Sequence, residues 1–223
     1  MPDFITFSSL LRTTAKYEMP IVRSRLLEVI RDAYPVTFEG LDPSKTLGEN
    51  VFSGPTPHPN AVLNLFVQQN LTSALPMAYY MAVRRGPESL MGRRLPANAR
   101  LPPEILQATI QGLFALREME LKETHRLIFG SNPPRSCLRQ ACPSRNTTGP
   151  RISEAHQKVA DRIVDSSNSG TKLLQVLSLR EICGDSFGFC EGCVEEWEAG
   201  HSDVRRKAWA ALSHVFGLEP EIV

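Results

Sequence analysis

The chain has 223 residues, of which 42% are hydrophobic and 22% are charged, and its formal net charge is +1. This composition is that of a folded protein with an apolar core, and it excludes a wholly disordered chain. The near-zero charge excludes an overall attraction to nucleic acid or acidic membranes. No apolar run approaches the roughly 18 to 20 residues of a membrane span, and the first residues do not form a secretory signal, so we expect a cytoplasmic or nuclear protein that is not secreted.

Apolar residues recur at spacings of three and four along most of the chain, and no segment shows the alternation of a strand. The first such run predicts a helical hairpin over residues 4–33. Its corner is expected at Met19-Pro20, because proline suits the first turn of a helix, where its missing N–H group costs nothing.

The same spacing predicts further helices along the rest of the chain. Their ranges are 42–47, 60–70, 73–84, 102–129, 153–166, 170–183, 191–200 and 203–216. Residues 53–59 are rich in proline and residues 84–100 in arginine and proline, so we expect loops there. Gly217 is expected to end the last helix. The predicted fold class is all-α, an irregular array in which a leading hairpin is followed by a helical domain.

A family resemblance begins in the predicted hairpin. Residues 7–35 read FSSLLRTTAKYEMPIVRSRLLEVIRDAYP, and this text is similar to the two helices that close a BTB (POZ) domain. The matching positions are Leu10, Leu11, Ala15, Lys16, Tyr17, Ile21, Leu26 and Leu27. The remainder resembles the C-terminal part of a large family of BTB-domain proteins from mushroom-forming fungi. Its carrying features are Ala33-Tyr34-Pro35, His58-Pro59 before an apolar helix, residues 75–80 (LPMAYY), two cysteine pairs, Trp209 and residues 215–218 (VFGL).

The resemblance implies two regions, the C-terminal helices of a truncated BTB domain at residues 1–35 and a helical C-terminal domain at residues 36–223. It also implies a role in protein–protein interaction or scaffolding, as an adaptor without catalysis. The resemblance starts inside the BTB domain, so the part that supplies its dimer interface has no counterpart here. That puts in doubt both BTB dimerisation and the family's link to cullin-type ubiquitin ligases.

The cysteines suggest a metal site, because a chain in the cytosol or nucleus keeps its thiols reduced. One pair lies in a proline-bounded loop and the other, with CxxC spacing, at the start of a predicted helix. The candidate ligands are Cys137, Cys142, Cys190 and Cys193. Four thiolates would bind one structural zinc ion and leave no open position for water. Cys183 or His201 could join the site, and the alternative is that these residues are free thiols that pack as small hydrophobes.

A group of arginines lies within the predicted loop at residues 84–100. Its members are Arg84, Arg85, Arg93, Arg94 and Arg100, with only Glu88 opposing them. Such a group could contact phosphates, but no aromatic side chains for base stacking are interleaved with it and no nucleic-acid motif is present. We therefore expect a solvated loop in preference to nucleic-acid binding.

The sequence contains no HExxH, P-loop or GxGxxG motif, so we expect no enzyme. The leading prediction is a protein-binding or scaffold module with an unknown protein partner, and the apolar face of the first helices is a candidate contact surface. One alternative is a zinc-bearing nuclear regulator that uses the arginine group. Another is a non-functional truncated fragment.

Overall fold

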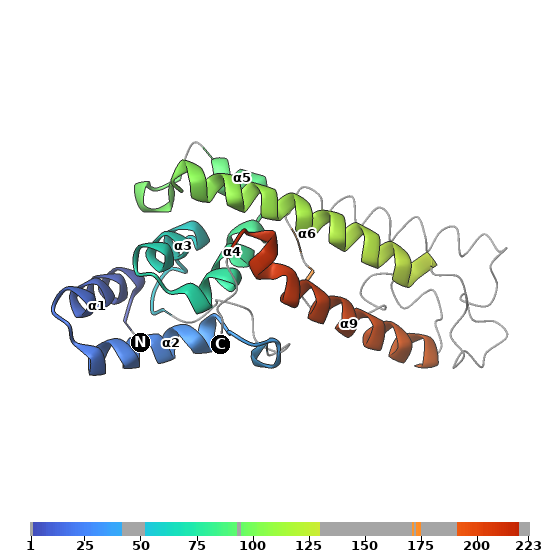
Figure 1. Ribbon diagram of the computed structural model, residues 1–223, viewed down its shortest axis with the longest axis horizontal. Coiled ribbons are helices and arrows are strands. Elements are labelled where there is room, and N and C mark those ends of the chain that lie inside the picture. Colours follow the sequence, from blue (N-terminus) through green and yellow to red (C-terminus); the bar gives the residue numbers. More distant parts are fainter. Residues whose placement is uncertain are drawn as a thin grey trace. The chain divides into compact units, whose positions relative to one another are not determined.

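The computed structural model describes residues 2–41, 52–92, 95–129, 171, 173–174 and 191–218. All regular elements in these ranges are helices (Figure 1). They are α1 (Phe4–Lys16), α2 (Pro20–Ala33), η1 (Phe38–Gly40), α3 (Pro59–Gln68), η2 (Thr72–Ala74), α4 (Leu75–Val83), α5 (Pro87–Met91), η3 (Ala97–Ala99), α6 (Pro103–Phe129) and α9 (Glu191–Val215). The predicted all-α class is confirmed for this part of the chain.

The helices belong to two compact units. The first comprises Met1–Leu113 with Ala211–Val223, and the second comprises Phe114–Ala210. Helices α6 and α9 contribute residues to both units. Each unit has its own buried apolar side chains and is described separately.

The core of the first unit is formed by α3 and α4. Residues 77–83 of α4 are all buried, and so are residues 59–66 of α3. A helix that is apolar all round has to be covered on every side, and α4 is such a helix. Around this pair, Phe7 and Leu11 of α1 and Ile30 of α2 are also buried.

Local capping explains where several helices begin. Asp3 caps α1, since its Oδ1 accepts a hydrogen bond from the backbone N–H of Thr6 at 2.9 Å. His58 caps α3 in the same way through its Nδ1, which accepts from the N–H of Asn60 at 3.3 Å. Pro59 follows at the first helical position, where a proline costs no hydrogen bond.

Three helices end in the same way, with one residue in the left-handed conformation. In α1, α3 and α9 the N–H group of the residue two positions beyond the C-cap donates to a carbonyl of the last turn, which satisfies an otherwise unpaired acceptor. These bonds are Met19 to Thr14 (3.0 Å), Leu71 to Phe66 (3.0 Å) and Leu218 to Ser213 (2.8 Å). The left-handed residues are Glu18 (φ 50°), Asn70 (φ 52°) and Gly217 (φ 66°). The prediction that Gly217 ends the last helix is confirmed.

The second unit contains residues 114–129 of α6 and 191–210 of α9. Its buried side chains are Leu116, Glu120, Thr171, Leu173, Leu174, Trp197, His201, Val204, Arg205 and Ala208. Arg205 is tied to this core, because its Nε donates to the carbonyl oxygen of Leu174 at 2.9 Å.

The C-terminal part differs from the prediction in one respect. Two helices, 191–200 and 203–216, were expected, but α9 is continuous from Glu191 to Val215. Gly200 is a poor helix former, and this residue type was the reason to expect a break at this point. The burial of His201 and its stacking on Trp197, one turn earlier, outweigh that local preference.

The loop prediction for residues 84–100 is also partly wrong. Gly86 takes a left-handed φ of 82°, which glycine adopts without strain, and Pro87 then begins the short helix α5. The 3-10 turn η3 follows. The helices predicted at residues 42–47 and 153–166, and nearly all of 170–183, lie outside the described residues.

The close packing of a phenylalanine ring against α6 requires glycine at position 112. A Cβ atom at Gly112 would overlap the ring of Phe216, which follows α9. The same ring stacks on Tyr79 of α4, with 4.9 Å between ring centroids and 21° between planes. Glycine at this position therefore allows α6 and the end of α9 to close over the core of the first unit.

We expect Glu18→Gly to stabilise the first unit by about 1 kcal/mol, because glycine removes the steric cost of the left-handed conformation. Glu18→Ala is the matched control, since it removes the same charge and keeps that cost. Thermal unfolding followed by circular dichroism measures the difference. Equal stability of the glycine and alanine variants would contradict the prediction.

We expect Gly112→Ala to destabilise the first unit by about 2 kcal/mol, although alanine is the better helix former, because the added methyl overlaps the ring of Phe216. Hydrogen exchange of the α4 amides measures the loss. In a Phe216→Ala background the overlap is gone, so the same change should become stabilising by up to about 1 kcal/mol. A loss of equal size in both backgrounds would disprove the steric explanation.

Candidate functional site

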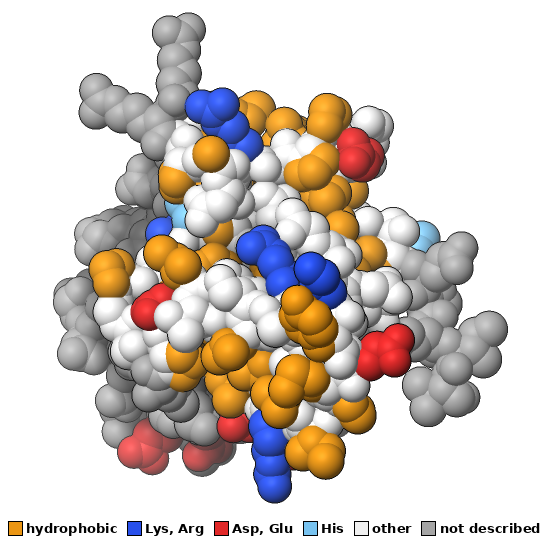
Figure 2. All heavy atoms as spheres, turned by 90° about the vertical axis from the view of Figure 1, so that its left-hand side faces the viewer, with side chains coloured by type: hydrophobic (Ala, Val, Ile, Leu, Met, Phe, Trp, Pro, Cys, Tyr) orange, Lys and Arg blue, Asp and Glu red, His pale blue; other side chains and the backbone are white. Residues whose placement is uncertain are grey.

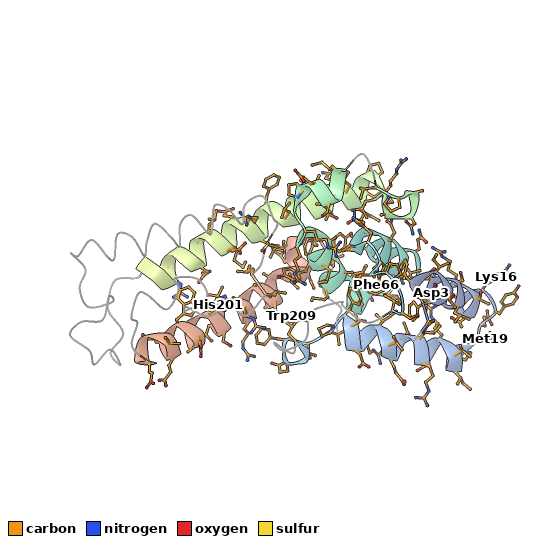
Figure 3. All side chains as sticks on the ribbon, turned by 180° about the vertical axis from the view of Figure 1, so that it is seen from behind. Asp3, Lys16, Met19, Phe66, His201 and Trp209 are labelled. Carbon is orange, nitrogen blue, oxygen red and sulfur yellow. The ribbon has the colours of Figure 1, made fainter. Side chains whose placement is uncertain are left out.

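The corner between α1 and α2 exposes large apolar side chains. Tyr17 is 64% exposed, Met19 43%, Ile21 79% and Val22 40%. We call these four residues the apolar tip. Figure 2 faces this end of the hairpin and shows apolar side chains gathered on the surface, with basic side chains above and below them. In Figure 3, Lys16 and Met19 lie at the free end of the hairpin, away from Phe66 in the core.

The apolar tip is held by the fold of the hairpin. Its left-handed residue, Glu18, sets the turn between the helices. One turn into α2, Arg23 donates from Nη2 to the carbonyl oxygen of Gln69 at 3.1 Å and from Nη1 to Gln69 Oε1 at 3.3 Å. A cation at this position also interacts favourably with the C-terminal end of α3. The tip is thus fastened to the core.

A pocket of about 360 Å³ lies beside the hairpin, between α1, α3 and the segment around η3. Its cationic lining consists of Arg12 from α1 and Arg100 from the residue after η3. Its apolar lining consists of Phe4, Ile5, Ala61, Leu65, Ala97 and Pro102. The described residues that line it include no carboxylate, so its charge is positive. We call it the arginine pocket.

Two asparagines on α3 fix one wall of the arginine pocket. The Nδ2 group of Asn64 donates to the carbonyl oxygens of Asn98 and Arg100, both at 2.9 Å. One turn earlier, Nδ2 of Asn60 donates to the carbonyl oxygens of Ser89 (3.1 Å) and Ala99 (3.2 Å). Both side chains are buried, and they replace water as partners of the loop carbonyls. The segment that carries Arg100 is therefore held to α3.

Arg12 is oriented by α3 as well, since its Nη2 donates to Gln68 Oε1 at 3.1 Å. Within the part of the chain that the structure describes, neither Arg12 nor Arg100 pairs with a carboxylate. An arginine that is not neutralised presents several N–H donors in a planar fork suited to a carboxylate or phosphate. The pocket thus combines unneutralised donors with an apolar wall.

Most of the predicted zinc ligands lie outside the described part of the structure. Cys137, Cys142, Cys183 and Cys190 lie outside it, and Cys193 lies in the first turn of α9. The prediction that Cys193 lies near the start of a helix is therefore confirmed, whereas that of Cys190 is not tested. Among the described residues no group of three or more potential ligands could hold a metal ion. The zinc site stays a prediction.

His201, the further ligand considered, is buried on α9 and stacks on Trp197, with ring centroids 6.0 Å apart. Burial, together with the nearby charge of Arg205, lowers the pKa of His201 from its ordinary 6.5 to about 4. A histidine in this environment is neutral at pH 7 and packs against its neighbours.

The predicted arginine group is spread over different surroundings. Arg84 is half-buried, Arg85 is exposed, and Arg100 lines the arginine pocket, while Arg93 and Arg94 lie outside the described residues. The segment that joins these positions is partly helical and is held to α3 by Asn60. Of the predicted group, the structure thus brings Arg100 together with Arg12, which the sequence analysis had not singled out.

The residues of the pocket wall were missed by the sequence analysis. A signal for two of them is present in the printed sequence, because Asn60 and Asn64 are four residues apart in an otherwise apolar helix. Two buried amides on one face of a helix need partners, and those partners have to be backbone or side-chain groups from elsewhere in the fold.

Comparisons with family models, with curated proteins and with solved structures found no match to this chain. The resemblance to fungal BTB-domain proteins therefore stays a prediction that depends on the residues quoted for it. In the described ranges no helix is sufficiently long and apolar to cross a membrane.

The lowered pKa of His201 predicts that the second unit loses stability in acid. Between pH 6.5 and 4 the unfolded chain binds the proton and the folded chain does not, so the contribution is fully present above pH 6.5 and falls as the pH drops. We expect about 2 kcal/mol to be lost between pH 7 and pH 5 through this group.

Denaturant unfolding followed by tryptophan fluorescence measures this loss, since both tryptophans, Trp197 and Trp209, lie in the second unit. His201→Gln is the comparison, because glutamine does not titrate. The fall in stability from pH 7 to pH 5 should be smaller in the variant by about 2 kcal/mol. The same fall in both proteins would contradict the assignment.

Proposed function

We propose that this chain is a non-catalytic protein-binding module of the BTB-domain type, acting in the cytoplasm or nucleus, and that it binds its partner with the α1–α2 hairpin. The observation that carries the proposal is the apolar tip. Four large apolar side chains within six residues remain exposed at the corner of a hairpin whose Phe7, Leu11 and Ile30 side chains are buried. Exposed apolar surface of this kind typically marks a site of protein association.

The energetics of the apolar tip favour association. Full burial of one large apolar side chain contributes about 1.5–3 kcal/mol, so a partner that covers all four of them gains a large part of the free energy that association requires. The tip includes a tyrosine and a methionine, which are enriched at protein interfaces. Because Arg23 and the turn at Glu18 already fix the hairpin, little conformational entropy is lost on binding.

The family resemblance supports the same surface. Leu10, Tyr17 and Ile21 are among the positions that match the closing helices of a BTB domain, and all three are exposed here. In that family the two helices pack against other parts of a domain. An apolar protein surface is therefore the chemistry we propose for the partner.

The titratable groups support a non-catalytic role. The described groups with shifted pKa values are Asp3, Tyr34, His58, Tyr79 and His201. The shift of Asp3 comes mainly from its capping hydrogen bond to Thr6, and the others come mainly from burial. In none of these described groups does a second carboxylate, thiol or histidine contribute to the shift, as it would in a paired acid–base site.

We expect Ile21→Asp to release the partner without unfolding the chain. Ile21 is 79% exposed and lies in the first turn of α2, where an acidic side chain is favourable. Its substitution places a charge in the proposed contact, which should raise the Kd for the partner at least about tenfold. Ser24→Asp, also exposed on α2, is the matched control and should change the Kd less than about twofold.

The partner is recovered with the tagged full chain from cells that express it, identified, purified, and titrated against the wild type and both variants. Circular dichroism checks that all three proteins are folded. The proposal fails if no protein is recovered in near-stoichiometric amount. It also fails if the recovered protein binds the Ile21→Asp variant as tightly as the wild type.

A further inference from the structure

Helix α1 contributes residues to the arginine pocket and ends at the apolar tip. Arg12 points to it from α1, and Lys16 follows Arg12 by four residues, so the two cations share one side of α1. Ile5 and Ser9, which also line the pocket, belong to the same row at helical spacing. This side of α1 therefore presents apolar and basic side chains and no acidic one.

The arginine pocket itself selects for a negative group. The guanidinium of Arg12 is oriented by Gln68, and the backbone of Arg100 is fixed by Asn64, so both arginines are held beside the pocket before a ligand binds. Hydrogen bonds from arginine to a carboxylate are charge-assisted and about twice as strong as neutral ones. The positive charge that they would neutralise is not neutralised by any described residue of the pocket lining.

The other walls of the arginine pocket select for an apolar group beside the negative one. Phe4 and Leu65 contribute to the lining, and Ile5 is 74% exposed at its edge. The volume of about 360 Å³ is near the lower end of the range for ligand pockets, roughly 300–1,000 Å³. It suits one or two side chains, not a whole helix.

We infer that the arginine pocket binds an acidic side chain, together with its apolar neighbour, from an acidic peptide segment of the partner protein. The inference depends on the proposed function, because it names the chemistry of the partner that docks on the hairpin. Arg12 and Arg100 hold the carboxylate, and the wall of Phe4, Ile5 and Leu65 covers the apolar side chain. Lys16 extends the positive surface toward the apolar tip, where the peptide continues.

Nucleic acid fits the same surface less well. Phe4 is the one aromatic residue among the described lining residues and is half-buried, so the pocket lacks the row of aromatic rings on which successive bases stack. A phosphate backbone would also gain nothing from the apolar wall. A peptide in which acidic and apolar residues alternate matches both parts of the pocket.

The test uses fluorescently labelled 12-residue peptides in which Asp or Glu alternates with Leu, Ile or Phe. The best binder from this set is titrated against the full chain by fluorescence anisotropy. Its binding should weaken about tenfold in Arg12→Gln and in Arg100→Gln and should weaken with added salt. Arg31→Gln, an exposed arginine of α2 outside the pocket lining, is the matched control and should bind like the wild type.

Several results would overturn the inference. One is the absence of binding by any acidic peptide, and another is equal binding of the peptide in which Asn and Gln replace the acids. Unchanged affinity of both pocket variants would have the same effect. So would tighter, Arg12-dependent binding of a single-stranded oligonucleotide of the same charge, which would assign the pocket to nucleic acid. Two independent arginines are tested, so misfolding of one variant, checked by circular dichroism, leaves the other decisive.

The purified natural partner separates this inference from the proposed function. If Ile21→Asp releases the partner and the two pocket variants do not, the hairpin is the binding surface and the role of the arginine pocket is disproved. If both kinds of variant weaken binding, both statements are supported. If neither does, the proposed function fails and the inference that depends on it fails too.

Discussion

Helix α3 is enclosed by the rest of the first unit along residues 59–66, and the arrangement of the whole unit follows from that enclosure. Its apolar side chains pack on α4, and its two buried asparagines supply hydrogen bonds to the segment that carries η3. At its C-terminal end, Gln68 and Gln69 receive Arg12 and Arg23 from the hairpin. Both surfaces that we propose for binding are therefore fastened to one short helix. A substitution that shifts α3 would therefore alter both the apolar tip and the arginine pocket.

The two surfaces that we propose for binding would contribute differently to recognition. The apolar tip offers area, and the removal of that area from water is the general source of affinity in protein association. The arginine pocket offers direction and charge, which discriminate between partners more than they add affinity. The boundary between them is Lys16, whose ammonium group lies 5.4 Å from the ring centroid of Tyr17. A partner that binds both surfaces has to present apolar and acidic side chains together. This requirement excludes most proteins that would bind the apolar tip alone.

Much of the helical framework could be predicted from the sequence, because helical spacing and capping residues are local signals. The hairpin at residues 4–33, the pair that became α3 and α4, and the long helix that begins at Pro103 are examples. Elements whose stability depends on tertiary contacts could be predicted less well from the sequence. The continuity of α9 through Gly200 depends on the burial of His201, and the turn η3 depends on amides about 35 residues earlier in the chain.

The candidate site illustrates the same limit. The exposed apolar side chains of the hairpin could be expected from the family resemblance, since that face has other structure to cover it in a BTB domain. The arginine pocket could not, because it is built from residues 4–12, 61–68 and 97–102, which only the fold brings together. Arg100 was noticed for its charge, but nothing in the sequence around it points to Arg12.

The hydrogen bonds of Asn60 limit which residues can replace it in related sequences. Its Nδ2 group donates both hydrogens to loop carbonyls, while its Oδ1 is buried with no hydrogen-bond partner among the residues that the structure describes. An aspartate would place a negative charge against those carbonyls, a serine could donate only one hydrogen, and a glutamine is one methylene too long. Apolar residues of α3 can be exchanged for others of similar volume at small cost, whereas none of these three replacements at position 60 keeps both hydrogen bonds. In a set of distant relatives, an Asn-x-x-x-Asn pair within an apolar helix would outlast most of the sequence around it, and it is the pattern by which to search for them.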